Sequence, residues 1–164
     1  MESVSSRETI AEDRSTTTRS RSKSKLRDAD YALSEQVGHL LRRAHQRHCG
    51  IFAEGMDSTL TPMQFAVLVT IDNTDGVSQN HLGRLVAMDP ATTQGVVRRL
   101  QDRELIEAVA DPSDRRRQIW HATGSGRRLL KKLLPKATEI SEATLAPLSA
   151  AERKQFLKLL EKLA

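Results

Sequence analysis

The sequence lacks any long apolar run, and it contains few aromatic residues and only one cysteine. The chain has 164 residues, of which 3% are aromatic and 29% are charged. There is no run of about eighteen apolar residues to cross a membrane, and the first residues lack the apolar segment of a secretory signal. Cys49 alone can form no internal disulfide, which agrees with a reducing compartment. We therefore expect a single soluble domain in the cytoplasm.

Sequence motifs of catalysis are also missing. No glycine-rich phosphate loop follows a predicted strand, and the chain contains neither a nucleophile elbow nor a zinc-protease helix. The stretch from Gly124 to Gly126 is more simply the start of a helix than a phosphate cradle. We expect a protein that is not an enzyme and that uses no cofactor.

Positive charge is concentrated in one part of the chain. The net charge is +5. Residues 29–83 carry 3 Lys and Arg against 6 Asp and Glu, whereas residues 84–128 carry 9 against 6. A cluster of this kind indicates a nucleic-acid partner better than the total charge does.

The first 28 residues differ in composition from the rest. They are rich in Ser, Thr, Arg and Lys and have almost no large apolar groups, so they cannot bury enough surface to offset the entropy of ordering. We expect a disordered basic arm over residues 1–28. Its alternating cations either follow DNA phosphates or make a solubilising tail.

The middle of the chain carries two short helix patterns separated by a tight turn. Apolar residues recur on one face of residues 78–86, turn-forming residues follow, and residues 90–104 form the second pattern. Asp89 can cap the second helix, while Pro90 takes its first position, where no backbone donor is needed. Two short helices joined in this way predict a helix-turn-helix.

The second of these helices has an apolar face and a polar face. Thr93, Val96, Val97 and Leu100 recur at helical spacing and are expected to pack inward. The opposite face is small and polar, and it suits the major groove, where Gln pairs with adenine and Arg with guanine. From this face and the start of the preceding helix we expect DNA contacts by Ser78, Gln79, Ala91, Thr92, Gln94, Gly95 and Arg98.

A β-hairpin is predicted after these helices. Residues 106–110 and 118–122 are rich in strand formers, and the sequence Asp-Pro-Ser-Asp between them favours a turn. Three successive arginines lie at its tip, so we interpret the hairpin as a wing that reaches into DNA. The wing adds Asp114, Arg115, Arg116 and Arg117 to the expected DNA-binding residues. The predicted fold is mainly α with a small β-hairpin, a winged helix-turn-helix.

Four segments of the chain, residues 77–86, 92–101, 111–116 and 122–126, resemble the multiple antibiotic resistance regulator (MarR) family. The resemblance extends from about Asp30 to the C-terminus. It implies a homodimeric winged-helix repressor whose DNA affinity responds to a small molecule. It also implies that Asp114 orients the wing by pairing with an arginine and that Arg116 enters the minor groove. One departure is Ala122-Thr123, where the family usually has Leu-Thr.

Further helices are expected on both sides of the DNA-binding region. Apolar residues at spacings of three and four predict a long helix over residues 30–53, and Thr61 and Pro62 open another over residues 63–71. Thr123 is expected to cap a leucine-rich helix that continues past Pro135 with a bend, and Ser149 with Glu152 forms a capping box for a last helix.

These flanking helices have more apolar surface than one neighbour needs, so we expect them to pair in a two-fold dimer. Such a dimer would space two recognition helices for half-sites one turn of DNA apart. The alternative is that the helices cover their own domain. The expected regions are the arm over residues 1–28, a dimerisation helix over 29–57, the winged helix-turn-helix over 58–123 and C-terminal dimerisation helices over 124–164.

Histidines and arginines border the apolar stripe of the first long helix. In the resembled family, a pocket for aromatic acids often lies between the first two helices and the partner's first helix. A cation and an imidazole beside apolar walls would bind a carboxylate and enclose a ring, and a resemblance to regulators of pyridine-carboxylate breakdown favours a nicotinate-like effector. The expected ligand-binding residues are His39, Arg42, His45, His48 and Met63. The alternative is that the histidines are solvated or hydrogen-bonded at an interface.

Other functions remain open from the sequence. His45, His48 and Cys49 are possible metal ligands, but no fourth ligand follows at a diagnostic spacing. Cys49 is otherwise a candidate redox sensor or an inert packing residue. A non-specific architectural protein that coats DNA is a further alternative. The preferred hypothesis is a repressor that leaves a pseudo-palindromic operator when a small aromatic or heteroaromatic acid binds, although the sequence does not distinguish repression from activation.

Overall fold

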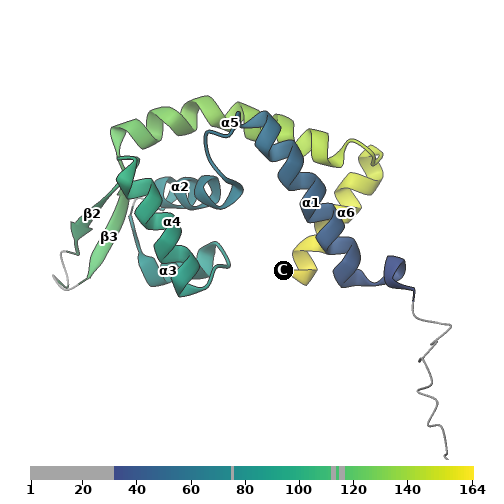
Figure 1. Cartoon of the computed structure of the whole chain (residues 1–164), viewed down its shortest axis with the longest axis horizontal. Coiled ribbons are helices and arrows are strands. Elements are labelled where there is room, and N and C mark those ends of the chain that lie inside the picture. The colour runs from purple at the N-terminus through teal and green to yellow at the C-terminus, as the bar shows by residue number, and fades with distance from the viewer. Residues whose placement is uncertain (1–31, 75, 112–113, 115–116) are drawn as a thin grey trace, which may run out of the picture. The chain divides into compact units, whose positions relative to one another are not determined.

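A helix-turn-helix packed against a small antiparallel sheet lies at one end of a long helix in the computed structural model (Figure 1). The structure describes residues 32–74, 76–111, 114 and 117–164, and residues 34–164 form one closely packed unit. The elements are η1 (Leu33–Glu35), α1 (Val37–Gly55), α2 (Pro62–Asn73), β1 (Val77–Ser78), α3 (Gln79–Leu85), α4 (Pro90–Asp102), β2 (Ile106–Ala110), β3 (Gln118–Ala122), α5 (Gly124–Leu145) and α6 (Ala150–Leu163).

The first long helix begins later than the sequence pattern predicts. A single 3-10 turn, η1, precedes Gln36, whose backbone is extended (φ −75°, ψ 128°), and α1 starts at Val37. The extended residue interrupts the helical hydrogen-bond ladder, so the prediction of one continuous helix from residue 30 is wrong. Residues 30 and 31 lie outside the described residues.

Three of the predicted helix starts are confirmed by their caps. The Thr61 side chain accepts from the backbone N–H of Gln64, and the side-chain oxygen of Gln64 accepts from the backbone N–H of Thr61. Ser149 and Glu152 form the same reciprocal pair before α6. Thr123 caps α5 through the N–H of Gly126 at 3.0 Å. Each cap satisfies backbone donors that the first turn of a helix leaves free.

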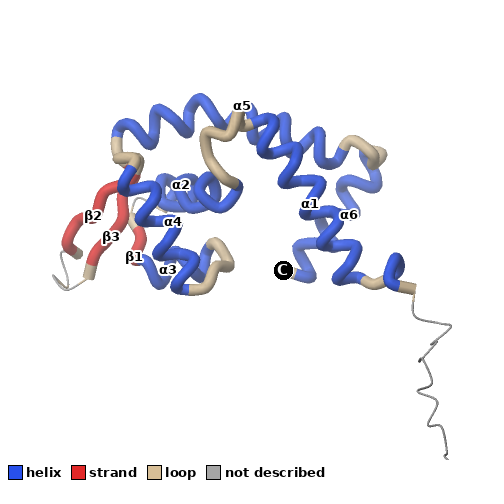
Figure 2. Tube along the Cα trace, viewed as in Figure 1, coloured by secondary structure: helices blue, strands red, loops and turns tan. Residues whose placement is uncertain are grey.

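The sheet has one strand more than the sequence predicts. The strands β2 and β3 form the expected antiparallel hairpin, with Ala108 opposite Trp120. On its other side β3 pairs with β1, with Val77 opposite Trp120 (Figure 2). The predicted start of a helix at Ser78 is therefore wrong by one residue, because Val77 and Ser78 belong to a two-residue strand that is too short for a period-2 pattern.

The hydrophobic core ties the helix-turn-helix to α5. Leu68, Ile71, Leu82, Leu100 and Ile106 are at most 2% exposed, and Leu130 and Leu133 of α5 are buried with them. Burial of such side chains stabilises a fold by about 1.5–3 kcal/mol each. The positions of α3 and α4 are therefore fixed by shared core contacts with α2 and α5.

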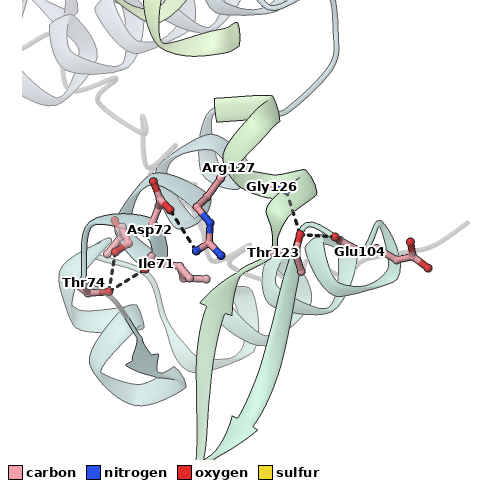
Figure 3. A network of polar contacts seen from close by, with 8 residues as sticks. Ile71, Asp72, Thr74, Glu104, Thr123, Gly126 and Arg127 are labelled. Atoms are coloured by element: carbon pink, nitrogen blue, oxygen red, sulfur yellow. Dashed lines mark hydrogen bonds and ion pairs between the residues drawn. The ribbon is translucent and has the colours of Figure 1, made fainter. Parts of the chain in front are cut away.

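Polar contacts hold the first turn of α5 to the elements around it (Figure 3). The Thr123 hydroxyl donates to the carbonyl of Glu104 at 2.7 Å, and Arg127 lies 4.0 Å from Asp72 of α2. A Cβ at Gly126 would lie 2.2 Å from the carbonyl oxygen of Leu105, so only glycine fits this approach. The start of α5 is thereby fixed to α2 and to the segment that follows α4.

The helix α5 continues through Pro135, as the sequence predicts. In contrast to the core, α1 and α6 leave many apolar side chains exposed within the single chain. Within the described part of the chain, no helix is both long enough and apolar enough to cross a membrane. The exposed apolar side chains of these two helices are Val37, Leu40, Leu41, Phe156, Leu157, Leu159, Leu160 and Leu163.

Candidate DNA-binding surface and ligand site

The N-terminus of α4 is fixed by Asp89. Its carboxylate accepts from the backbone N–H of Thr92 at 2.9 Å and from the Thr92 hydroxyl at 2.5 Å. These hydrogen bonds, the side-chain one first, hold the pKa of Asp89 below its usual 3.8. Pro90 occupies the first helical position, as expected. A charged cap therefore sets the direction in which α4 leaves the turn.

The two faces of α4 separate as the sequence predicts. Thr93, Val96, Val97 and Leu100 are at most 2% exposed. On the other side Arg98 is exposed, and its guanidinium lies 4.0 Å from Asp102 in a loose pair. Ala91 and Gln94 are exposed as well, while Thr92 and Gly95 are half-buried.

The turn between α3 and α4 brings the two helices into close contact. Ala87 has a left-handed backbone (φ 51°), and the N–H of Met88 donates to the carbonyl of Gly83 at 2.9 Å. A Cβ at Gly83 would lie 3.0 Å from Thr93 Oγ1 and 3.2 Å from the Met88 carbonyl oxygen. The absence of a side chain at Gly83 thus allows α3 to approach α4.

The wing begins with a short ladder of backbone hydrogen bonds. The N–H of Asp111 donates to the carbonyl of Arg117 at 2.9 Å, and the N–H of Arg117 donates to the carbonyl of Asp114 at 2.8 Å. Arg117 and Asp114 are exposed. Arg115 and Arg116 lie outside the described residues, so their contacts and the roles of Asp114 and Arg116 in the wing stay predictions.

A polar hollow of about 530 Å³ separates α3 from the sheet. It brings together Ser78, Gln79 and Arg117, three of the residues that the sequence assigned to DNA. Four further lining residues were missed by the sequence analysis, because they become neighbours only when β1 pairs with β3. These residues are Asn80, Arg84, Gln118 and Trp120.

The expected ligand-binding histidines lie along α1 with different partners. His39 Nδ1 is 3.2 Å from the Arg42 guanidinium, and His45 Nε2 is 3.5 Å from Cys49 Sγ. His48 Nδ1 is 2.9 Å from Thr144 Oγ1 of α5. In the part of the chain that the structure describes, no three His, Cys, Asp or Glu side chains are placed to hold a metal ion.

His45 and His48 line a mainly apolar cavity of about 410 Å³ between α1, the end of α5 and α6. His39, Arg42 and Met63 are not among its lining residues, so the structure divides the predicted ligand set. Met63 is 47% exposed at the start of α2. The other lining residues are Leu41, Ala44, Ser141, Thr144, Leu145, Phe156, Leu157 and Leu160.

A row of aromatic rings connects this cavity with α2. The ring of His48 lies 6.1 Å from that of Phe52, and Phe52 lies 5.9 Å from Phe65 of α2 in an edge-on arrangement. Phe52 is buried. The His48 ring is therefore linked to α2 through a single side chain, that of Phe52.

Arg47 holds α1 to the last turn of α5. Its guanidinium donates to the carbonyls of Thr144 at 2.5 Å and Ala143 at 3.1 Å. A cation beside the carbonyls at a helix C-terminus is favourable, since the helix dipole is negative there. This contact and the bond of His48 to Thr144 join the histidine-bearing helix to α5.

Comparisons with known proteins give a consistent picture. A family model described as MarR family matches residues 58–117. The chain is 43% identical over 139 residues to the HTH-type transcriptional repressor NicR of Pseudomonas putida, a match that covers 84% of this chain and 88% of that protein.

Two solved structures are similar in both fold and sequence. BpsR of Bordetella bronchiseptica, whose DNA binding is regulated by 6-hydroxynicotinic acid, has a TM-score of 0.78 and 42% identity, covering 81% of this chain and 96% of that chain. PcaV of Streptomyces coelicolor, solved with its natural ligand, has a TM-score of 0.77 and 32% identity. The match covers 81% of this chain and 94% of that chain.

Proposed function

The chain belongs to the MarR family of transcriptional regulators, and we propose that it is a repressor released from operator DNA by a nicotinate-like heteroaromatic acid. The observation that carries this proposal is the exposed polar face of α4 opposite a fully packed apolar face, in a chain 43% identical to a transcriptional repressor. A regulator of this kind is not an enzyme, and it acts where the DNA is, in the cytoplasm.

DNA recognition is assigned to α4 and the wing. Gln94 and Arg98 are exposed and are the longest side chains of the proposed reading face, so they reach base edges in the major groove. Ala91 and Gly95 permit close approach of the helix to DNA. Arg117 at the base of the wing contributes phosphate contacts, which position the protein without selecting a sequence.

A homodimer is assigned to the exposed apolar surface of α1 and α6. Leu41 and Leu157 are 46% and 53% exposed in the single chain, and both line the same cavity. Apolar side chains gathered on two helices are typical of an obligate interface. The proposed regions are dimerisation over residues 29–57 and 124–164, with DNA binding over 58–123.

The effector is assigned to the histidine-bearing side of α1. His45 and His48 offer imidazoles against an apolar wall, which suits a heteroaromatic ring. Arg42 lies one helical turn before His45 and is exposed, so it is the cation that we assign to the carboxylate. BpsR, at 42% identity, is a relative whose DNA binding is regulated by 6-hydroxynicotinic acid.

The long helix α5 offers a route from effector to DNA. Its first turn is bonded to Glu104 and paired with Asp72, and its last turn is bonded to Arg47 and His48. A ligand that binds one orientation of α1 better than another thus shifts the spacing of the two recognition helices. Such coupling requires that the ligand have unequal affinity for the two states.

The test is release of DNA by a panel of acids. The wild-type protein is bound to a duplex selected from a randomised library, and 6-hydroxynicotinate, nicotinate, benzoate and zinc ions are added in turn. Release by the heteroaromatic acids, blunted in His45→Ala, is expected. Release by zinc alone would favour a metal sensor instead, and equal affinity for scrambled DNA would favour an architectural protein.

A further inference from the structure

Two hollows lie on either side of α3 and share three of its residues. The first, against the sheet, is the polar hollow of about 530 Å³ described above. The second, of about 480 Å³, lies between α3 and the start of α4 and includes Gly83, Met88 and Pro90 in its walls. The residues common to both hollows are Gln79, Asn80 and Arg84. We call these three residues of α3 the ridge; it separates the hollow beside α4 from the hollow beside the base of the wing.

Two arginine side chains beside the ridge, Arg84 and Arg117, have no acceptor among the residues that the structure describes. Arg84 is exposed, and among the described residues its guanidinium has no hydrogen bond and no ion pair. The same holds for the guanidinium of Arg117 across the hollow. Neither hollow is lined by a carboxylate. Two uncompensated cations and several amide groups therefore face one space.

The form of DNA determines what this space receives. When one element enters the major groove and the next enters the adjacent minor groove, the sugar-phosphate strand that separates the grooves passes between them. In this chain one hollow lies between α3 and the start of α4, and the other lies between α3 and Arg117 at the base of the wing. A side chain in this place would meet the DNA backbone and not a base edge if the two elements entered adjacent grooves.

We propose that Arg84, with Arg117 opposite, holds a DNA phosphate between the recognition helix and the wing. The proposal rests on the proposed function, since it requires α4 and the wing to bind adjacent grooves. The planar guanidinium donates two parallel hydrogen bonds to phosphate oxygens. Arg84 then adds affinity for any duplex and fixes how deep α4 enters the groove, without selecting a base.

The experiment compares Arg84→Gln with Arg128→Gln, a matched control. Arg128 is an exposed arginine on the first turns of α5. Binding is measured over a series of salt concentrations, with the selected duplex and a scrambled duplex. Arg84→Gln is expected to weaken binding of both duplexes by the same factor, about tenfold. The plot of log affinity against log salt concentration should become shallower by about 0.9 for each protomer. Arg128→Gln should bind as the wild type does.

Neutral methylphosphonate linkages placed one at a time along the selected duplex give a second measurement that needs no change in the fold. One position in each half-site should weaken the wild type but leave Arg84→Gln unaffected. A loss confined to the selected duplex would mean that Arg84 reads a base, and an unchanged salt slope would mean that it touches no phosphate; either overturns the proposal. If the wild type itself prefers no duplex, the proposed function fails instead.

Discussion

Nδ1 of His48 and Oγ1 of Thr144 lie 2.9 Å apart across the junction of α1 and α5. The Thr144 hydroxyl donates its one proton to the carbonyl of Ile140 at 2.8 Å, so it accepts from His48. The neutral imidazole therefore carries its proton on Nδ1 and leaves Nε2 as an acceptor. A ring in the neighbouring cavity that offers an O–H or N–H group matches this tautomer.

Thr144→Val should weaken the response to the effector. Without the hydroxyl, the His48 ring loses the partner that fixes its tautomer, and a hydrogen bond of this kind is worth about 1 kcal/mol, or about fivefold in effector concentration. DNA binding without effector should not change. Thr138→Val removes a hydroxyl that also bonds back to its own helix, at Leu134, and serves as control. Equal behaviour of the two variants would remove His48 from the effector site.

Gly83→Ala should destabilise the protein. The added methyl would lie 3.0 Å from Thr93 Oγ1 and 3.2 Å from the backbone oxygen of Met88, in a turn that has little room to move. Overpacking of this kind costs about 1–3 kcal/mol, more than alanine gains in a helix. The measurement is the free energy of unfolding in urea. No loss of stability would show that the turn relaxes freely.

Gly95→Ala separates stability from DNA binding. The nearest atom to a Cβ at Gly95 is Arg99 Nη2 at 3.9 Å, an ordinary contact. The free energy of unfolding should therefore rise by about 0.5–1 kcal/mol. If α4 enters the major groove by this face, the methyl hinders its approach and DNA affinity falls. A variant that is more stable and binds DNA equally well would place Gly95 outside the interface.

The structure supports the sequence interpretation most closely where the pattern is local. The caps at Thr61, Asp89 and Ser149 and the inward face of α4 depend on residues three or four apart, which sequence spacing records directly. The hairpin bounds are equally local, since strand formers flank a turn sequence.

The parts that the sequence did not predict depend on contacts between distant segments. Val77 becomes a strand residue only because Trp120 lies opposite, and Arg84 faces Arg117 only after that pairing. The division of the expected ligand residues has the same cause. The bond of His48 to Thr144 joins residues 96 positions apart, so no local spacing can indicate it.

Arg98→Ala should relax the base preference of DNA binding. The side chain of Arg98 is 82% exposed and only loosely paired with Asp102, so it is free to bind a guanine edge. Loss of such a bidentate contact costs about 1–3 kcal/mol of discrimination at one base pair. Competition among duplexes mutated at single positions measures this base discrimination, and Arg99→Ala serves as control. A uniform loss over all duplexes would reassign Arg98 to a phosphate.

Asp89→Asn should make stability less sensitive to acid. Hydrogen bonds from Thr92 lower the pKa of Asp89, so the charged form stabilises the folded state. This contribution is complete above the usual pKa of 3.8 and is lost as the pH falls through the lowered pKa. Asparagine still accepts from the N–H of Thr92 but does not titrate. Urea unfolding at about pH 5 and pH 3 should show a smaller difference for the variant. If the variant and the wild type lose the same free energy of unfolding between the two pH values, the Asp89 carboxylate does not contribute to the acid sensitivity.

Leu157→Glu should separate the protomers. Leu157 is 53% exposed on α6, so a carboxylate there leaves the single chain intact but places a charge in the proposed interface. A two-fold axis repeats the change, and we expect dimerisation to weaken at least about 100-fold. Sedimentation velocity measures the association, and DNA binding should fall with it, because one protomer covers only one half-site. Val109→Glu, on β2 and 48% exposed, is the control for the sedimentation measurement alone, because β2 belongs to the wing. A Leu157→Glu protein that stays dimeric would place the interface on another surface, and the route from effector to DNA through α5 would then need a different partner contact.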